Sequence, residues 1–394
     1  MEGGETMKKA VMLLVSVQFF VYFGFGLIIP ILPEVIVNQG FHDMHVGGLL
    51  TIYALASFFT APLWGRLSDR IGRKKLILVG LVGFSVSFLM IALFIDSLPM
   101  LYASRVIGGL FSGALYTAVT GFIGDISTDD NRNMYMGFMG MSIGLGFIFG
   151  PAIGGLLGQI SLTLPFFVSA ILIFLLLFYA AAVLKEPETR KLGSAKEIIP
   201  QGTSKLFSYR VRYLFIFSFI VTFLLSGVES TLQLFQIDQI NITSAQLGSL
   251  FLFSGFVDFF IQGMVVRKVK DGQEVKWLAG AQVLTAIGLL MLPFTTNLIY
   301  AGVALCVFTA GNALARTLNT SLASKESGGM YGTAAGLSYS MDNLGRIIGP
   351  LFFTWLLTWQ GGNTYYVSAV LAIISITVLV LFTRSSKSLR QKKA

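Results

Sequence analysis

The chain contains about twelve long apolar stretches, each long enough to cross a lipid bilayer as a helix. A membrane-spanning helix needs about 20 mostly apolar residues, whereas a strand of a membrane barrel needs only about 10 residues in strict alternation. None of these stretches alternates, so helices are the only spanning element that the sequence permits. The approximate stretches are 10–37, 45–65, 75–95, 98–124, 133–158, 163–184, 211–234, 245–266, 276–296, 298–323, 331–358 and 361–383. We therefore predict an all-α polytopic membrane protein with twelve transmembrane helices.

Composition and charge exclude several other classes of protein. Only 12% of the 394 residues are charged, against about 25% in a soluble domain. The single Cys306 cannot form an internal disulfide, which excludes a secreted disulfide scaffold. The net charge of +9 lies in short clusters between apolar runs, not on a water-facing surface that a nucleic acid could bind. We therefore expect membrane lipids, and no nucleic acid, as partners.

The basic residues indicate the orientation of the chain. All but three of the 28 Lys and Arg residues lie at the two termini or in alternate loops, and the opposite loops carry none. Because loops rich in Lys and Arg stay in the cytoplasm, both termini are predicted to be cytoplasmic. We expect a multi-pass protein of the bacterial inner or plasma membrane, and the absence of long extramembrane domains fits that location.

The sequence divides into two related halves around its longest polar stretch. This stretch, 185–210, is predicted to be a cytoplasmic linker between an N-terminal six-helix bundle, 1–184, and a C-terminal bundle with a basic tail, 211–394. The run from Gly146 to Pro151 recurs as the run from Gly345 to Pro350. Chance alignment of membrane glycines would also explain this match. An internal duplication is typical of secondary transporters, which bind substrate between their halves near the bilayer midplane.

Several ionisable residues lie within the apolar stretches, where each costs roughly 2.5–3.5 kcal/mol at a helix centre. Such residues persist when they pair with one another or line a cavity. Asp342 and Arg346 are four residues apart on one predicted helix, so this pair is explained equally well as a structural ion pair or as a functional site. Five more ionisable residues lie within or at the edge of such stretches, namely Glu34, Arg105, Glu229, Asp258 and Arg316.

Glu229 and Asp258 are the leading candidates for carrying a proton. Glu229 has no basic residue within one helical turn, and Asp258 also lacks a local partner. An unpaired carboxylate in a medium of low dielectric can take up and release a proton, and it would also attract a lipophilic cation. The alternative for Asp258 is a helix–helix hydrogen bond.

Four segments carry motifs, namely Gly65–Lys75, Ser104–Gly109, Gly146–Gly155 and Gly24–Pro33. These segments resemble those of the major facilitator superfamily, in particular its twelve-helix drug:proton antiporters such as quinolone, multidrug and tetracycline efflux pumps. The loop from Gly65 to Lys75 resembles the signature between the second and third helices. The run Ser104–Gly109 is similar to the arginine-glycine motif of the fourth helix. The run from Gly146 to Gly155 resembles the GxxxGPxxGG motif of the antiporters, and Gly24–Pro33 resembles their first helix.

The resemblance implies roles for particular residues. A conformational latch would be formed by Gly65, Asp69, Arg73 and Asp125, with Asp69 braced by the N-terminus of a helix of the other half, here the eleventh span. The alternative is a basic loop that only sets the topology. A hinge would be formed by Gly146, Gly150, Pro151 and Gly154, although plain close packing explains the same glycines. Arg105 would tune a nearby proton site.

The sequence also departs from the family pattern. The second-half copy of the first motif, at 263–270, lacks the aspartate, so only one half would carry the full latch. Some multidrug relatives carry an acid beside the arginine of the tenth helix, and the stretch 311–316 has none. Proton coupling would then depend on Glu229 with Asp258 or Asp342, assisted by Arg105.

The predicted substrate pocket is apolar and aromatic. Its candidate lining residues are Phe19, Tyr22, Tyr53, Tyr116, Phe138, Met141, Glu229, Phe253, Arg316 and Tyr339. No phosphate-binding GxxxxGK[ST] motif is present, so the energy would come from an ion gradient. His42 and His45 lack a companion Cys or His, so we predict no metal site. We also expect no cofactor and no enzymatic activity.

The leading functional hypothesis is a monomeric, proton-coupled exporter of amphipathic, often cationic, drugs that works by alternating access. A second hypothesis keeps the fold and changes the cargo to one endogenous metabolite, sugar or lipid-like molecule. A third is a membrane scaffold or sensor without flux, against which the intramembrane charges argue.

Overall fold

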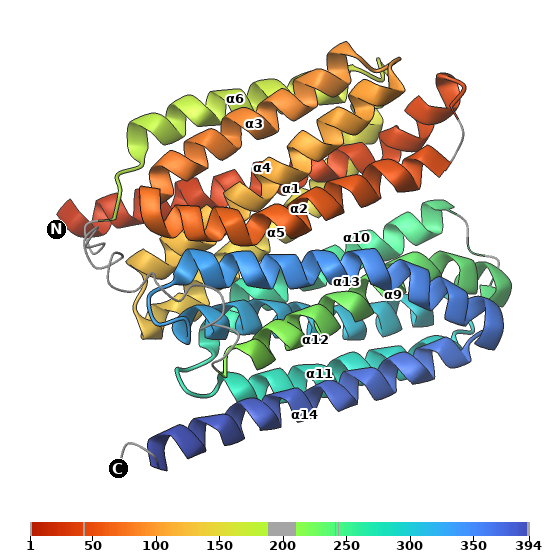
Figure 1. The fold of residues 1–394 in the computed structure, drawn as a ribbon. Helices are drawn as coiled ribbons and strands as arrows, with labels where there is room; N and C mark the ends of the chain where they lie inside the picture. Colours follow the sequence, from red (N-terminus) through yellow and green to blue (C-terminus); the bar gives the residue numbers. More distant parts are fainter. Residues whose placement is uncertain (1, 42–43, 188–209, 241, 243, 392–394) are drawn as a thin grey trace. The chain divides into compact units, whose positions relative to one another are not determined.

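Long helices make up almost all of the chain in the computed structural model (Figure 1). The structure describes all residues except 1, 42–43, 188–209, 241, 243 and 392–394. The first six long helices are α1 (Glu2–Asn38), α2 (Met44–Ile71), α3 (Arg73–Leu93), α4 (Leu98–Ile126), α5 (Asp129–Gly158) and α6 (Leu164–Val183). The other six are α9 (Arg212–Ile240), α10 (Ser244–Phe260), α11 (Glu274–Met291), α12 (Leu298–Lys325), α13 (Tyr331–Gln360) and α14 (Asn363–Gln391).

These twelve helices confirm the predicted all-α membrane fold. Among the described residues, eleven of them contain a segment that is long and apolar enough to cross a membrane. The twelfth, α13, has 30 residues, but it carries Asp342, Arg346 and many small polar residues. Its polar character is expected for a helix that faces other protein segments rather than lipid along part of its length.

The described chain groups into two compact units. Unit 1 comprises Met1–Thr128, Phe138–Glu197 and Gly329–Ser340; unit 2 comprises Asp129–Gly137, Ile198–Gly328 and Met341–Ala394. The first turns of α5 therefore group with unit 2, and the first turns of α13 group with unit 1. Most of the predicted linker 185–210 falls outside the described residues, so the six-plus-six division at that point remains a prediction.

Small residues bring α5 against α1 within unit 1. A Cβ atom placed on Gly146 would lie 2.7 Å from the backbone nitrogen of Phe23, and one on Gly150 would lie 2.7 Å from the Phe23 carbonyl oxygen. A Cβ on Gly154 would lie 2.9 Å from the carbonyl oxygen of Leu27. The predicted hinge residues thus form a close helix–helix contact, in which Pro151 also lies 3.0 Å from the Cβ position of Gly26.

The same arrangement recurs in unit 2, where α13 packs against α9. A Cβ atom on Gly345 would lie 2.8 Å from the backbone nitrogen of Phe223, and one on Gly349 would meet the Ser226 hydroxyl. Ser226 donates a hydrogen bond to the Gly345 carbonyl at 3.0 Å. The repeated glycine–proline run therefore makes equivalent contacts in both units, which supports duplication over chance alignment.

Candidate functional site

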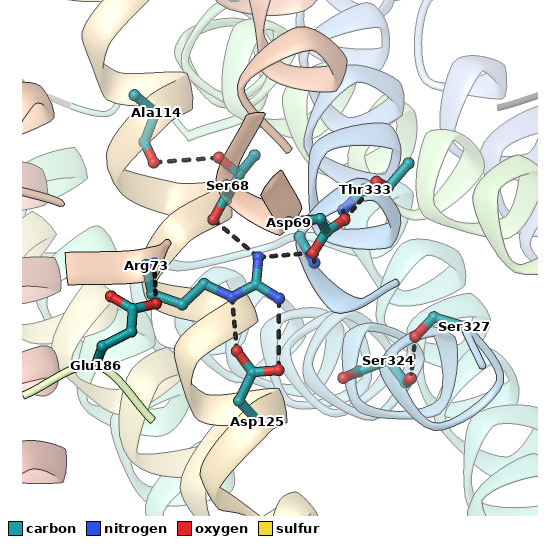
Figure 2. Close-up of polar contacts among 11 residues, drawn as sticks. Ser68, Asp69, Arg73, Ala114, Asp125, Glu186, Ser324, Ser327 and Thr333 are labelled. Atoms are coloured by element: carbon teal, nitrogen blue, oxygen red, sulfur yellow. Dashed lines mark hydrogen bonds and ion pairs between the residues drawn. The ribbon is translucent and has the colours of Figure 1, made fainter. Parts of the chain in front are cut away.

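A buried arginine gathers charges from several helices of unit 1 (Figure 2). Arg73 is the first residue of α3, and its side chain is only 2% exposed. Its guanidinium lies 2.7 Å from the Asp69 carboxylate and 2.7 Å from the Asp125 carboxylate. It also donates a hydrogen bond to the Ser68 hydroxyl at 2.8 Å. Two acids and a hydroxyl therefore compensate the one buried cation.

Asp69 binds the N-terminus of α13, as the family resemblance implies. One carboxylate oxygen accepts the backbone N–H of Gly332 at 3.1 Å. The other accepts the backbone N–H of Thr333 at 2.8 Å and the Thr333 hydroxyl at 2.5 Å. The first N–H groups of a helix have no partner within the helix and carry a partial positive charge, so they bind a carboxylate well.

Glu186 supplies a further anion to this group, which sequence analysis missed. Its carboxylate accepts the backbone N–H of Arg73 at 2.6 Å and that of Lys74 at 3.0 Å. It thereby caps α3, whose first residue is a cation at the positive end of the helix dipole. Gly72 precedes it with a φ of 115°, and a Cβ there would lie 2.9 Å from a Glu186 oxygen. Only glycine meets both requirements.

Gly65 permits the close approach of α2 to α13. A Cβ atom on Gly65 would collide with the Gly332 carbonyl oxygen, and one on Gly332 would collide with the Arg73 guanidinium. Movement of Gly332 would disturb its hydrogen bond to Asp69, and movement of the Arg73 side chain would disturb its ion pairs. We give the name Arg73 cluster to Gly65, Ser68, Asp69, Arg73, Asp125, Glu186, Gly332 and Thr333.

A second group of charges lies within the apolar helices of unit 2. Asp258 on α10 lies 3.2 Å from the Arg316 guanidinium of α12 and accepts a hydrogen bond of 2.6 Å from Gln262. Gln262 in turn accepts the Thr317 hydroxyl at 2.6 Å. Asp258 has no basic partner on its own helix, as the sequence indicates. The helix–helix hydrogen bond that the sequence left as its alternative is present, because Arg316 donates to it from a different helix. Residue spacing along one helix could not show that contact.

Glu229 also has a cationic neighbour on another helix. Its carboxylate lies 3.8 Å from the guanidinium of Arg346 on α13, so the prediction of an unpaired Glu229 is wrong. The pair is loose, because the Glu229 side chain is 45% exposed and that of Arg346 is 31% exposed. Arg346 therefore makes its ion pair with Glu229 rather than with Asp342, its neighbour one turn earlier on α13.

Asp342 is held by hydroxyl groups. It accepts hydrogen bonds from Ser218 at 2.7 Å and from Thr222 at 2.9 Å, both on α9. Among the described residues, no Lys or Arg lies within ion-pairing distance of it, although Arg346 and Arg316 act on it electrostatically. Glu229 also acts electrostatically on Asp258. Each of these five charged residues therefore interacts electrostatically with two of the others. We call Glu229, Asp258, Arg316, Asp342 and Arg346 the charged ring.

The charged ring contains three acids and two bases, so it has one carboxylate more than its guanidinium groups can neutralise. With Asp258 beside Arg316 and Glu229 beside Arg346, the excess falls on Asp342. A carboxylate that lies inside a membrane-spanning segment without a neutralising guanidinium is stabilised when it gains a proton or a nearby cation.

Arg105 belongs to unit 1, whereas the five residues of the charged ring belong to unit 2. Its side chain is 2% exposed, and its Nε and one Nη atom have no hydrogen-bond partner in the described part of the chain. The guanidinium carbon lies 5.9 Å from the centres of the Tyr53 and Phe88 rings, at the distance of a cation–π contact. The two rings compensate part of its charge.

The predicted aromatic lining residues are distributed over both units, and their role in substrate binding stays a prediction. In unit 1, Tyr116 stacks on Tyr339 with ring centres 4.3 Å apart, and Tyr22 lies 5.4 Å from Phe147. Phe253 is elsewhere, 62% exposed in an apolar groove of unit 2. The remaining candidates lie on α1 (Phe19), α2 (Tyr53), α5 (Phe138 and Met141) and α12 (Arg316).

The described residues contain no group of three or more His, Cys, Asp or Glu side chains that could hold a metal ion. The features that stand out are instead two duplicated helical units, a charged cluster around helix ends and ionisable residues inside membrane-spanning helices. These features define a polytopic membrane transporter.

The chain belongs to the Major Facilitator Superfamily, whose family model matches residues 14–350. It is 27% identical to the quinolone resistance protein NorA of Staphylococcus aureus over 390 residues, which cover 98% of this chain and all of that protein. It is also 27% identical to multidrug resistance protein 1 of Bacillus subtilis over 374 residues, covering 93% of this chain and 95% of that one. The protein is therefore a multi-pass transporter of the bacterial cell membrane.

Two solved structures share the fold. The human organic anion transporter MFSD10 superposes with a TM-score of 0.81 at 23% identity, covering 94% of this chain and 99% of that chain. The Escherichia coli fucose:proton symporter FucP gives a TM-score of 0.76 at 15% identity, with 95% and 97% coverage. At these identities the likeness concerns the fold alone.

Proposed function

We propose that this protein exports amphipathic, cationic small molecules in exchange for protons. The similarity to a quinolone resistance protein and a multidrug resistance protein over nearly the whole chain supports drug export. The observation that carries the proton part is the charged ring, in which three carboxylates face two guanidinium groups inside one helical unit. One proton or one cationic substrate would neutralise the excess negative charge.

Asp342 is the best candidate for the proton-carrying residue. The acids that sequence analysis ranked first, Glu229 and Asp258, both lie beside an arginine. Asp342 instead accepts two hydroxyl hydrogen bonds, which can be kept in either protonation state because a hydroxyl donates or accepts. Glu229, the most exposed acid of the charged ring, is better placed to meet a cationic substrate. Arg105 and the aromatic candidates of unit 1, which exclude Phe253, would then serve substrate binding.

Within the Arg73 cluster, the latch of the transport cycle is proposed to consist of Gly65, Asp69, Arg73 and Asp125. It binds the first turns of α13 to unit 1, while the rest of α13 groups with unit 2. Releasing Asp69 from the N-terminus of α13 would free that helix end, which the charge pattern places on the cytoplasmic side. Alternating access would then require this bond to break and re-form in each cycle, with close contacts such as Gly146 on Phe23 guiding the movement.

Proton movement in proteoliposomes tests the proposal. Addition of the lipophilic cation tetraphenylphosphonium to vesicles with an internal pH dye should change the internal pH when the wild-type protein is present. Asp342→Asn should abolish this pH change, because the amide cannot carry a proton. Glu229→Gln should weaken binding of the cation, because it removes the negative charge nearest to solvent.

Asp96→Asn is the matched control, since Asp96 is an exposed carboxylate outside the charged ring; it should leave the pH change intact. Full coupling in both Asp342→Asn and Glu229→Gln would remove the charged ring from the mechanism. A pH change with one metabolite or sugar and with no lipophilic cation would support the second cargo hypothesis instead.

A further inference from the structure

Unit 2 carries an apolar groove that the charged ring does not use. It has a volume of about 540 Å³ and lies among α10, α11 and α12, near the N-terminal ends of α10 and α12. Its lining residues are Ser249, Leu250, Phe253, Leu284, Leu298, Ile299, Gly302, Val303, Cys306, Val307 and Ala310. The volume falls within the range of roughly 300–1,000 Å³ that small-molecule sites have.

One glycine accounts for the groove. The equivalent helices of the two units begin 200 residues apart, since α2 and α4 begin at Met44 and Leu98 and α10 and α12 at Ser244 and Leu298. At that offset, Gly302 corresponds to Tyr102 in unit 1.

In unit 1 the corresponding space is filled. The Tyr102 hydroxyl lies directly against the Cβ position of Gly48 and 3.1 Å from the His45 ring nitrogen Nδ1. In unit 2, a Cβ on Gly302 would meet only the end of the Leu250 side chain, at 3.2 Å. The missing tyrosine side chain therefore leaves space beside Leu250 in unit 2, at the position that the Tyr102 side chain occupies in unit 1.

The groove opens on an apolar face. Ile299 is 80% exposed, and Phe253 and Val303 are also exposed. The helices that form it are membrane-spanning by length and composition, so this face is surrounded by the hydrocarbon of the bilayer. The two polar groups of the lining are the Cys306 thiol and the Ser249 hydroxyl, and Ser249 already donates to the carbonyl of Gln246 at 2.6 Å. Nothing in the lining would orient a charged or strongly polar ligand.

We propose that the groove holds one acyl chain of a membrane lipid. Its lining on α12 runs from Leu298 to Ala310, which at about 1.5 Å per residue corresponds to roughly 18 Å along the helix. One leaflet contributes about half of the roughly 30 Å of hydrocarbon in a bilayer. The groove is therefore about as long as one leaflet is deep, and it begins at the helix ends that the charge pattern places on the outer side.

A photoreactive lipid tests the proposal without any need for transport. Phosphatidylcholine with a diazirine on one acyl chain is incorporated into proteoliposomes that contain the full-length protein, and crosslinked peptides are mapped by mass spectrometry. We expect crosslinks concentrated at Val303, Cys306 and Val307. Gly302→Leu should reduce them at least about tenfold, because the leucine side chain displaces several methylene groups of the bound chain.

Gly280→Leu is the matched control. Gly280 is an exposed glycine of α11 outside the groove, with no atom within 4 Å of its Cβ position, so its replacement should leave the crosslinks unchanged. If Gly302→Leu does not fold, Ala310→Phe narrows the other end of the groove and should give the same loss.

Two results would overturn the proposal. Crosslinks spread evenly around the helices of unit 2 in the wild-type protein would show that no chain is retained in the groove. Crosslinks at Cys306 that disappear on addition of tetraphenylphosphonium would show that the groove belongs to a transported cation instead.

Discussion

The two units each hold an ion pair between the start of one helix and the end of the next, but with opposite signs. In unit 1, Arg73 at the first residue of α3 pairs with Asp125 at the end of α4. In unit 2, Glu274 at the first residue of α11 pairs with Lys325, the last residue of α12. Glu274 lies 201 residues after Arg73, and Lys325 lies 200 residues after Asp125. The pairs are therefore equivalent positions of the duplicated units with their charges exchanged.

The two units also bind the start of a further helix in different ways. In unit 1 the Asp69 carboxylate accepts the backbone N–H groups of Gly332 and Thr333 at the start of α13. In unit 2 the start of α5 is bound through a side chain instead of through backbone N–H groups. Asn133, near the start of α5, donates a hydrogen bond to the Val269 carbonyl at 3.0 Å. Ser321 donates to the same amide at 2.5 Å, and Glu274 accepts from it at 3.4 Å. We call Asn133, Asp271, Glu274, Ser321 and Lys325 the Lys325 cluster.

The exchange of charges changes how each helix start is stabilised. Glu274 is an acid at the N-terminus of α11, where the helix dipole favours it. Arg73 is a base at the N-terminus of α3, where the dipole opposes it, and Glu186 offsets this by binding the first N–H groups. The sign of the pair is thus free to change provided that a carboxylate remains at the helix start. The two units differ in how strongly they bind the further helix start. The ionised Asp69 carboxylate binds the backbone N–H groups of α13 more strongly than the neutral Asn133 amide of α5 binds the Val269 carbonyl.

Removal of Arg73 should have the largest effect on stability. Arg73→Leu would leave Asp69 and Asp125 facing each other with no cation between them, and breaking a buried pair from one side costs about 3–5 kcal/mol. We expect a loss of this size in the free energy of unfolding in detergent micelles, together with loss of transport. The charge-exchanged double variant, Arg73→Glu with Asp125→Lys, should recover only part of it, because the new glutamate at the start of α3 would repel Asp69. Full recovery would show that Asp69 contributes little.

Removal of Lys325 should cost less. In Lys325→Met the Glu274 carboxylate keeps the Asn133 amide, and Asp271 is half exposed. We expect a loss of about 2 kcal/mol in the free energy of unfolding, within the range for hydrogen bonds to charged groups. A double-mutant cycle with Glu274→Gln isolates the pairwise contribution. A loss equal to that of Arg73→Leu would contradict the difference drawn between the units.

Glu186 should contribute a smaller amount. Glu186→Gln keeps the shape of the side chain and removes its charge, so the cap on α3 is weakened but not lost. Loss of a helix-capping group costs about 1 kcal/mol, and we expect no more than this from thermal unfolding monitored by circular dichroism. Because the Arg73 pair with Asp125 remains, transport should persist. A larger loss than that of Lys325→Met would show that Glu186 is part of the latch itself.

Much of this arrangement could be predicted from residue patterns, and the parts that could not be predicted were missed for two reasons. Apolar length predicts the helices, because the bilayer fixes how long each must be. The motif from Gly65 to Lys75 predicts the contacts of Asp69 and Arg73, because it fixes both chemistry and spacing. The role of Asp125 and of the start of α13 follows from the family pattern, and the structure places both beside Arg73.

Contacts between helices far apart in sequence were missed. The pairs Glu229 with Arg346 and Asp258 with Arg316 join residues of different helices, and spacing along one helix reveals only neighbours three or four residues away. The Lys325 cluster was missed for a different reason. A search for a second aspartate finds none at the expected place, whereas a search for opposite charges at an offset of about 200 residues would have found Glu274 and Lys325.

Asp271 should give the smallest effect, and one that depends on pH. The Lys325 ammonium, which donates a hydrogen bond to the carboxylate at 2.6 Å, lowers the pKa of Asp271 below its ordinary value of 3.8. A carboxyl group whose pKa is lower in the folded state stabilises the fold above its unfolded pKa. That contribution is complete at neutral pH and is lost as the pH falls through the folded pKa. The side chain is 48% exposed, so solvent screening limits it to about 0.5 kcal/mol.

Asp271→Asn should therefore lower the free energy of unfolding slightly at pH 7 and leave it unchanged at a pH below the folded pKa, where the wild-type carboxyl group is also neutral. Added salt should shrink the difference at pH 7, because the pair is open to solvent. Lys325 keeps its contact with Glu274 in this variant, so the buried part of the Lys325 cluster stays intact. A difference that persists in acid would mean that Asp271 acts through packing rather than charge, and the Lys325 cluster would then depend on Glu274 and Asn133 alone.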